Sequence, residues 1–271
     1  MSAASRTRLD QAVVERGLAE SRNAARGMIM AGLVLVDGVV VDKAGAPVRP
    51  EAEIGLKARP RFVSRAGEKL ARALAVFELD VRGRRAIDVG ASTGGFVDCL
   101  LQNGVEAVIA VDVGYGQLDS RLAGDPRVHV LDRVNARYLT REMLPHVPDL
   151  LTTDVSFISL EKVLPAVVAC MAPEFLAVLL VKPQFEAGPE RVGKGGIVRD
   201  PHVHEDVLLG VVRMLGERLD LAVRAMCDSG LPGVHGNREF VVWAERGGGP
   251  AASLDTLERQ VRTVVVGEGG L

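Results

Sequence analysis

Residues 86–96 read Ala-Ile-Asp-Val-Gly-Ala-Ser-Thr-Gly-Gly-Phe, and this stretch decides the fold. An apolar run leads into the glycines and a helical pattern follows them, so the glycines lie in a strand-to-helix turn. Glycine is needed there because a Cβ would block close approach of the backbone to a ligand. Asp112 ends the next apolar run, 22 residues after Gly90. A carboxylate at that place accepts hydrogen bonds from ribose hydroxyls, so the sequence predicts a nucleoside-binding site.

The same turn argues against a pyrophosphate ligand. Ser92 stands where a dinucleotide fingerprint has its second glycine, the position at which pyrophosphate is least forgiving. Asp88 precedes the loop and fits an uncharged or cationic ligand better than a phosphate. It could orient the loop and complement the positive amino-acid end of S-adenosylmethionine. We therefore predict S-adenosylmethionine as the cofactor, with an NAD-dependent oxidoreductase as an alternative.

The predicted cofactor-binding residues come from the glycine loop and from the ends of the next two strands. They are Asp88, Gly90, Ser92, Thr93, Gly94, Gly95, Phe96, Asp112, Val113, Asp132 and Arg133. Asp132 and Arg133 are expected to frame the adenine. A second glycine-rich stretch, 188–195, resembles the start of a P-loop but has Gly195 where a magnesium-binding Ser or Thr belongs. That stretch is predicted to be a mobile loop over the active site.

Outward from the turn, apolar runs alternate with helical patterns. Strands are predicted at 85–89, 107–112, 127–131, 149–153, 176–182, 222–227 and 239–244. Helices are predicted at 65–77, 95–103, 159–171, 203–218 and 253–265. Near-continuous apolar strands are typical of parallel strands buried on both faces. The pattern predicts a doubly wound, Rossmann-like α/β sheet.

The first 60 residues follow a different pattern. Helical spacing over 8–17 and 22–31 precedes two β-branched runs around Asp37-Gly38, a strong hairpin signal. Residues 1–70 hold 12 Lys+Arg and 8 Asp+Glu, a net +4, whereas residues 71–271 hold 21 and 27, a net −6. A basic front on an acidic body indicates contact with a polyanion, although an ordinary solvated basic surface has the same charge. We predict a small α+β domain at 1–58, a linker at 59–64 and the main domain at 65–271.

The composition favours a cytoplasmic protein. Among the 271 residues no run of about 18 is apolar, and the N-terminus lacks the apolar stretch of a secretory signal. The cysteines, Cys99, Cys170 and Cys227, are odd in number and lack metal-binding spacing. We predict neither a membrane partner nor a metal site.

Four charged residues accompany the predicted strand ends. Asp154 and Lys182 end two core strands, Glu239 begins another, and Lys69 lies on the helix before the glycine loop. Carboxyl ends of strands face the ligand crevice of a doubly wound sheet. A ribose hydroxyl becomes a good nucleophile once its proton is removed, and a lysine amine can take that proton in its uncharged form. A second ammonium and partial desolvation favour that form.

Seven strings along nearly the whole chain resemble the TlyA family of bacterial ribosomal RNA 2′-O-methyltransferases, often catalogued as haemolysins. They are Arg8-Leu-Asp-x-x-Val-x-x-Arg-Gly-Leu-x-x-Ser-Arg22, Val63-Ser-Arg-Ala-Gly-Glu-Lys69-Leu, Asp88-Val-Gly-Ala-Ser-Thr-Gly-Gly-Phe96, Asp112-Val-Gly-Tyr-Gly-Gln117, Asp154-Val-Ser-Phe-Ile-Ser-Leu160, Val181-Lys-Pro-Gln-Phe-Glu186 and Gly236-Asn-Arg-Glu239. The resemblance implies an N-terminal S4-like RNA-binding domain and an FtsJ-like class I methyltransferase domain.

The resemblance also implies particular roles. The family's catalytic Lys-Asp-Lys-Glu set falls on Lys69, Asp154, Lys182 and Glu239, and its basic RNA-binding positions fall on Arg6, Arg8, Arg22 and Lys43. The implied substrate is cytidine in 23S and also 16S ribosomal RNA, as naked RNA or in subunits. A membrane-acting cytolysin is the alternative that the haemolysin label suggests. The target nucleotide, the choice between one and both subunits, and the oligomeric state stay open.

Overall fold

The computed structural model describes residues 6–57, 60–249 and 252–267. The chain divides into two compact units, Met1–Pro60 and Arg61–Leu271. Residues 58 and 59, where the expected small domain meets the expected linker, lie outside the described residues. Phe62, expected in the linker, is 3% exposed and packs in the core of the second unit. The second unit therefore begins within the stretch expected to be linker.

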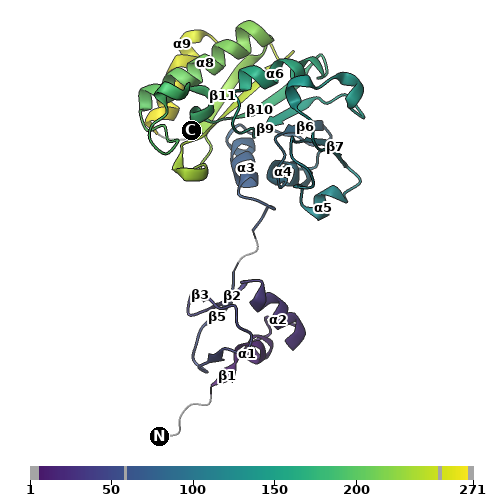
Figure 1. Ribbon diagram of the computed structural model, residues 1–271, viewed down its shortest axis with the longest axis vertical. Coiled ribbons are helices and arrows are strands. Elements are labelled where there is room, and N and C mark those ends of the chain that lie inside the picture. The colour runs from purple at the N-terminus through teal and green to yellow at the C-terminus, as the bar shows by residue number, and fades with distance from the viewer. Residues whose placement is uncertain (1–5, 58–59, 250–251, 268–271) are drawn as a thin grey trace. The chain divides into compact units, whose positions relative to one another are not determined.

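The N-terminal unit joins two short helices to small antiparallel sheets (Figure 1). Its elements are β1 (Thr7–Arg8), α1 (Leu9–Glu15), α2 (Arg22–Met30), β2 (Val34–Val36), β3 (Val39–Val40), β4 (Pro47–Val48) and β5 (Ile54–Leu56). Ser21 caps α2 by accepting a hydrogen bond from the backbone N–H of Ala24. Asp37 and Gly38 both have positive φ and connect β2 to β3, so the predicted hairpin is confirmed.

The second unit is built on a sheet whose described strands follow the order β11-β12-β10-β9-β6-β7-β8. The strands are β6 (Arg85–Val89), β7 (Ala107–Val111), β8 (Val128–Leu131), β9 (Leu150–Thr153), β10 (Phe175–Val181), β11 (Ala222–Asp228) and β12 (Phe240–Arg246). β12 runs antiparallel to both of its neighbours, whereas β6 to β10 pair in parallel. The expectation of parallel strands was wrong for β12, because a strand buried on both faces shows the same apolar run in either direction.

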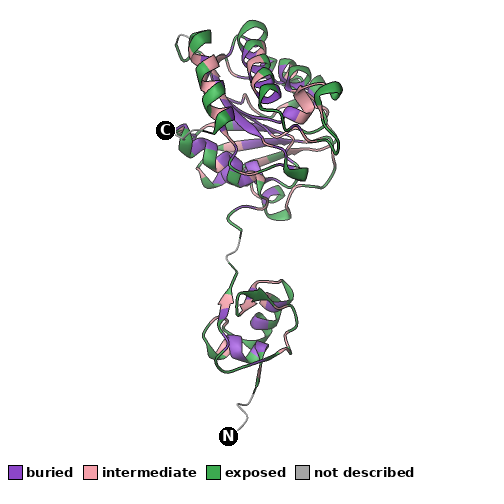
Figure 2. Ribbon diagram, turned by 90° about the vertical axis from the view of Figure 1, so that its left-hand side faces the viewer, coloured by how far each residue is buried: buried purple, intermediate pink, exposed green. Residues whose placement is uncertain are grey.

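Helices cover both faces of this sheet (Figure 1). One face carries α3 (Ala66–Val76) and α4 (Gly95–Gln102), and the other carries α6 (Leu160–Ala169), α8 (Pro201–Leu219) and α9 (Leu254–Val266). The buried residues concentrate on the strands between these layers (Figure 2). The sheet is thus covered on both sides, as predicted for a Rossmann-like fold.

Short elements connect the larger ones. They are α5 (Ser120–Ala123), α7 (Pro183–Glu186) and the 3₁₀ turns η1 (Ala136–Tyr138), η2 (Arg141–Met143), η3 (Pro189–Arg191) and η4 (Val234–Gly236). The glycine-rich stretch 188–195 contains η3, and its Gly193 forms a bridge with Ile197 just beyond it. Asn237 anchors this stretch, since its side chain accepts from Val198 N and donates to Gly196 O.

Candidate active site

The glycine loop lies against the end of the neighbouring strand. Gly90 has a φ of 86°, and a Cβ there would lie 2.8 Å from the carbonyl oxygen of Asp154. A Cβ on Gly95, the first residue of α4, would lie 2.3 Å from Ser64 Oγ and 2.8 Å from Gly67 N. Both glycines are required because other backbone segments occupy the space that a side chain would need. The loop therefore brings β6, β9 and the start of α3 close together.

Two cavities open around this loop. The larger has a volume of about 490 Å³ and is bordered by the ends of β6 to β9; the smaller, about 90 Å³, lies between the loop and the segment that leads into α3. Gly90, Ser92 and Asp154 border both of them. Of the residues predicted to bind the cofactor, Gly90, Ser92, Asp112 and Val113 line the larger cavity. Asp88, Gly90, Ser92, Thr93, Gly95 and Phe96 line the smaller one.

Asp112 ties the glycine loop to the loop after β7. Its Oδ2 accepts a hydrogen bond from Ser92 N at 2.8 Å, and its Oδ1 accepts one from Gly114 N at 2.7 Å. A carboxylate oxygen has a second lone pair, and Asp112 lines the larger cavity. It can therefore hold both loops and still accept from a ligand hydroxyl.

Asp88 is buried at the smaller cavity and is only half satisfied. Its Oδ1 accepts a hydrogen bond from Thr152 Oγ1 at 2.7 Å, while its Oδ2 has no hydrogen-bond partner within the described part of the chain. Burial raises the pKa of this carboxyl to about 7, although the Thr152 hydrogen bond acts in the opposite direction. A ligand cation beside Oδ2 would satisfy the free oxygen and favour the ionised form.

Asp132 and Arg133 have a different place from the one expected. Asp132 Oδ2 accepts a hydrogen bond from Gly116 N, and the Arg133 guanidinium lies 4.2 Å from the centroid of the Tyr115 ring. Both residues shape the loop after β7 and neither lines the larger cavity, which the next residues, 134–137, border instead. Gly94 also lines neither cavity, and a Cβ on it would clash with Leu118 and Leu122.

The four residues predicted to be catalytic form two ion pairs. Lys69 Nζ lies 2.5 Å from Glu239 Oε2, and these side chains are 10% and 3% exposed. Lys182 Nζ lies 2.6 Å from Asp154 Oδ1, with exposures of 10% and 18%. Lys182 also donates to Ser156 Oγ at 2.8 Å. Both lysines are therefore nearly buried and held by a carboxylate.

Strand register explains why these residues meet. Asp154 follows β9 and Lys182 follows β10, so both lie at the carboxyl edge of the parallel strands. Val181 pairs with Phe240 across the antiparallel ladder, which brings Glu239, the residue before β12, to that same edge. In a parallel strand Glu239 would have been at the opposite edge. The direction of β12 therefore completes the set.

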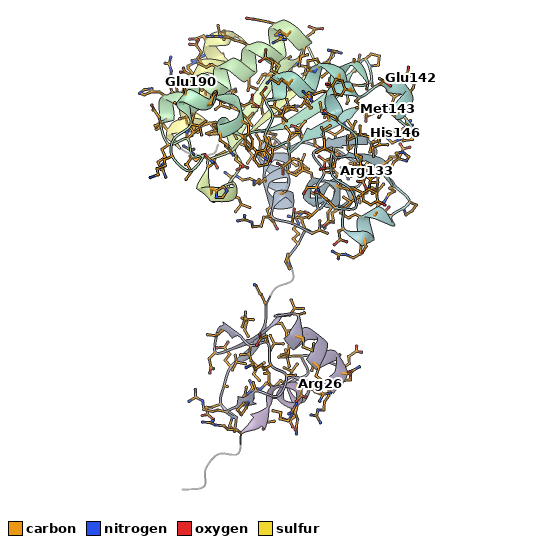
Figure 3. All side chains as sticks on the ribbon, viewed as in Figure 1. Arg26, Arg133, Glu142, Met143, His146 and Glu190 are labelled. Atoms are coloured by element: carbon orange, nitrogen blue, oxygen red, sulfur yellow. The ribbon has the colours of Figure 1, made fainter. Side chains whose placement is uncertain are left out.

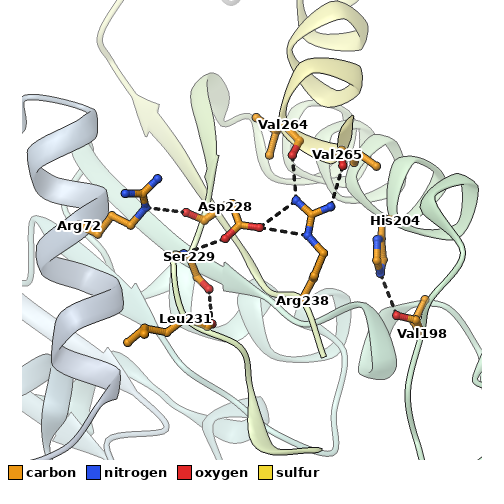
Figure 4. A network of polar contacts seen from close by, with 10 residues as sticks. Arg72, Val198, His204, Asp228, Ser229, Leu231, Arg238, Val264 and Val265 are labelled. Atoms are coloured by element: carbon orange, nitrogen blue, oxygen red, sulfur yellow. Dashed lines mark hydrogen bonds and ion pairs between the residues drawn. The ribbon is translucent and has the colours of Figure 1, made fainter. Parts of the chain in front are cut away.

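Figure 4 shows the polar contacts that hold the segment just before β12. Arg238 donates to Asp228 Oδ2 and to the carbonyl oxygens of Val264 and Val265 near the end of α9. Arg72, on the helix that carries Lys69, donates to the carbonyl oxygen of Asp228. The Lys69–Glu239 pair is thus backed by contacts that join α3, β11 and α9.

The segment after β10 holds the segment after β9 at several points. Besides the Lys182 contacts, the Phe185 ring lies 5.1 Å from the Phe157 ring, and Glu186 Oε1 accepts a hydrogen bond from Leu160 N at the start of α6. Burial raises the pKa of Glu186 to about 7. Phe157 has a φ of 64° and is 91% exposed at the larger cavity. An exposed, strained aromatic at a cavity indicates a functional position.

Sequence reasoning missed several residues of the larger cavity. They are Gln117, Val134, Asn135, Ala136, Arg137, Val155, Ser156, Phe157, Ile158 and Val163. Most of them follow the ends of β8 and β9. The rule that strand ends face the crevice could have identified these segments, although it could not say which side chains turn inward.

The N-terminal unit presents the predicted RNA-binding residues at its surface. Arg6 and Lys43 are exposed, whereas Arg8 and Arg22 are about half exposed and donate to the carboxylate of Asp10. The loop that carries Lys43 lies beside α1, since Asp10 N donates to Ala44 O. These cations therefore share one part of this unit.

Two features are absent from the described residues. No group of three or more His, Cys, Asp or Glu in that part of the chain is placed to hold a metal ion. No helix there is both long and apolar enough to cross a membrane.

The fold and the cavities at its strand ends define a methyltransferase of the FtsJ-like class, whose family model matches residues 62–246. The S4 domain model matches residues 7–54. Within that class, the chain belongs to the TlyA family. These matches confirm the predictions of the fold class, of an enzyme and of S-adenosylmethionine as its cofactor, and they decide against a dinucleotide-dependent oxidoreductase.

Individual relatives cover nearly the whole chain. The Mycobacterium tuberculosis protein named 16S/23S rRNA (cytidine-2′-O)-methyltransferase TlyA is 43% identical over 266 residues, which cover 97% of this chain and 98% of that one. Hemolysin A of Brachyspira hyodysenteriae is 38% identical over 237 residues, with coverages of 86% and 98%. A solved Streptococcus thermophilus structure that also carries a hemolysin name is 40% identical, covers 97% and 96% of the two chains, and superposes with a TM-score of 0.73.

Proposed function

We propose that this protein transfers a methyl group from S-adenosylmethionine to the ribose 2′-hydroxyl of cytidine in ribosomal RNA, in both 16S and 23S RNA, in the cytoplasm. The observation that carries the proposal is the contact of Lys182 with Asp154, which lines both cavities of an FtsJ-like fold, together with the buried Lys69–Glu239 pair. The relative named as a 16S/23S enzyme shares both units with this chain over nearly its full length. Its name supports cytidine as the target.

The cavities suit S-adenosylmethionine. The unpaired Oδ2 of Asp88 offers an acceptor for the ammonium of the methionine end, beside glycine-loop residues that line the smaller cavity. Asp112 offers an acceptor for the ribose hydroxyls in the larger cavity, and the nearby Val134 and Ala136 offer apolar contacts for adenine. When bound, this cofactor supplies an electrophilic methyl group on a sulfonium.

Lys182 is placed to take the proton of the attacking hydroxyl. Ser156 Oγ, 2.8 Å from Lys182 Nζ, marks a distance and direction at which this amine holds a hydroxyl oxygen. Lys182 would take the proton that the 2′-hydroxyl releases as its oxygen accepts the methyl group, and bound S-adenosylmethionine would supply that methyl group. Asp154 orients Lys182 and then stabilises the ammonium that forms.

Lys69 and Glu239 support this step from the adjacent strand end. The Lys69 side chain is a second nearly buried lysine at this edge of the sheet. Glu239 holds Lys69 and can accept a hydrogen bond from the ribose, which helps to align the oxygen with the methyl group.

Lys182→Ala tests the assignment. We expect methyl transfer to fall by about 10²–10⁴-fold, because the base is lost. Affinity for S-adenosylmethionine, measured by calorimetry, should stay within about twofold of the unaltered protein, because the proposed cofactor contacts do not involve Lys182. The rate is measured as labelled methyl incorporation into unmodified ribosomal subunits, and mass spectrometry locates the methyl on ribose.

The matched control is Lys162→Ala, which removes an exposed lysine of α6. It should leave the rate unchanged. A near-normal rate for Lys182→Ala would overturn the assignment of the base, and methylation on a base rather than on ribose would overturn the proposed reaction.

A further inference from the structure

The N-terminal unit contains a buried carboxylate that holds three arginines. Asp10, on α1, is 0% exposed. Its Oδ1 accepts from Arg8 Nε at 3.0 Å, and its Oδ2 accepts from Arg8, Arg22 and Arg26 at 3.0, 3.2 and 3.2 Å. Three of these four hydrogen bonds converge on Oδ2, so this one oxygen joins all three arginines.

The arginines keep much of their surface outside this contact. The side chains of Arg8, Arg22 and Arg26 are 48%, 54% and 52% exposed. Arg22 uses only its Nη2 and Arg26 only its Nε on Asp10. Within the described residues no second acceptor engages either group, so each keeps N–H donors for a ligand. One negative and three positive charges leave the cluster with a net +2.

Without the Asp10 carboxylate, the close approach of the three guanidinium groups would be unfavourable. Three guanidinium nitrogens lie within 3.2 Å of one oxygen, so no two of them are more than 6.4 Å apart. Like charges this close repel each other, and long arginine side chains lose rotamer freedom when they are ordered. Asp10 offsets both effects before any ligand arrives. A preformed site of this kind binds more tightly because less ordering remains to be done.

A second feature fixes Arg8 from the other side. A Cβ on Gly45 would lie 2.9 Å from Arg8 Nη1 and 3.3 Å from its Cζ, so the guanidinium rests against the backbone of Gly45. Arg8 is thus held between Asp10 and this loop. The same loop carries the exposed Lys43, which adds a further cation beside α1.

We propose that Asp10 holds three arginines as one preformed site for the backbone phosphates of RNA. The arginines are Arg8, Arg22 and Arg26, and Arg26 is thereby an additional RNA-contacting residue (Figure 3). Guanidinium groups bind phosphate oxygens through paired N–H donors, and contacts of this kind position a protein on RNA without reading its sequence. The inference rests on the proposed function, since it assumes that this unit binds ribosomal RNA.

Asp10→Asn separates positioning from simple charge. The substitution makes the unit more positive by one, so charge alone predicts tighter RNA binding. If Asp10 is a positioning residue, binding weakens by about tenfold, because the arginines are no longer held together. Affinity is measured by fluorescence anisotropy with a labelled ribosomal RNA fragment at several salt concentrations. Binding as tight as that of the unaltered protein, or tighter, would overturn the proposal.

Arg26→Ala tests the direct contact. We expect a three- to tenfold loss of affinity and a salt dependence, log K against log salt, that is shallower by about 0.7–0.9. The matched control, Arg49→Ala, removes one exposed arginine of the same unit that pairs only with the exposed Asp37 and Glu51. It should change affinity less than twofold. Equal effects of the two substitutions would show that only net charge matters and would reject the site.

Two further measurements keep the outcomes distinct. Gly45→Ala disturbs Arg8 without any change of charge and should weaken RNA binding a few-fold. This test remains if NMR shows that Asp10→Asn is unfolded. Unchanged RNA affinity in both Gly45→Ala and Arg26→Ala would reject the site. Methyl transfer by the unaltered protein is measured in parallel. If it neither binds nor methylates ribosomal RNA, the proposed function fails, whereas normal methylation with unaffected variants rejects only this inference.

Discussion

Each of the two units contains a buried aspartate, and the two aspartates differ in how many hydrogen bonds they accept and in the direction of their pKa shift. Asp10 accepts four hydrogen bonds from arginines, and its pKa lies well below the ordinary value, chiefly because of the Arg8 hydrogen bond. Asp88 accepts one hydrogen bond, from Thr152, and burial raises its pKa to about 7. Asp10 therefore has its partners within the protein, whereas Asp88 has an oxygen left for a ligand.

Glycines repeat this contrast. Gly17, after α1, has a φ of 69° and open space around it, whereas Gly90, in the cofactor loop, has a φ of 86° and backbone atoms of Asp154 and Val155 within 3.1 Å of where a Cβ would be. One glycine is needed only for its dihedral angle. The other is needed also because the ligand loop is pressed against a neighbouring strand.

Among these tests, the difference in cofactor binding and Tm should be largest between Gly90→Ala and Gly17→Ala. Both substitutions place a side chain at positive φ, at a cost of about 1–2 kcal/mol. Gly90→Ala must in addition displace the end of β9, which carries Asp154, so we expect loss of detectable cofactor binding in calorimetry and a clearly lower Tm. Gly17→Ala should bind the cofactor normally. Equal behaviour of the two variants would remove the contrast between the loops.

Asp88→Asn should give an intermediate effect that depends on pH. A carboxyl whose pKa is raised from 3.8 to about 7 stabilises the ligand-free fold below about pH 4 and loses that contribution as pH rises through 7. A cationic ligand favours the ionised form, so cofactor affinity should rise with pH up to about 7, by at most about tenfold per pH unit. Calorimetry from pH 5 to 8 should show this rise in the unaltered protein and a flat profile in Asp88→Asn. The same rise in both proteins would mean that another group is responsible.

The pH dependence of stability that comes from Asp10 should be the smallest of these effects, and its direction is opposite to that of Asp88. Because its pKa is lowered from 3.8, its contribution to stability is present above about pH 4 and is lost as pH falls below that. Methyl NMR signals of Ile29 and Ile54, both in the N-terminal core, should report urea unfolding that becomes easier between pH 4 and 2. Asp10→Asn should show a smaller change over that range. An undiminished pH dependence would assign the acid sensitivity to other carboxyls.

Much of the second unit could be predicted from local sequence. The glycine turn, Asp112 and the apolar runs identify the cofactor fold, because each depends on residues near one another in the chain. The pairing of Lys69 with Glu239 joins residues 170 positions apart, so no local pattern contains it. The direction of β12 was also hidden, and it decides which edge of the sheet Glu239 reaches.

The details of the cavities were harder to predict than the fold. Asp132 and Arg133 were expected to frame the adenine, whereas the next four residues border the larger cavity, and Arg133 itself has a positive φ. In the N-terminal unit the basic residues were predicted, yet Asp10 was not, because a single acidic residue among arginines gives no sign that it is buried. Contacts across a turn or between helices determine which residues border the cavity and whether Asp10 is buried.

The position of β12 also has a consequence for assembly. This strand is the last of the sheet in the chain, yet it lies between β10 and β11, so the sheet closes only after residue 246 has been synthesised. Until then β10 presents an open edge and Lys69 lacks its carboxylate partner. A premature stop between codons 229 and 239 would therefore leave a sheet without its inner strand β12 and Lys69 without Glu239, rather than a shortened enzyme with partial activity.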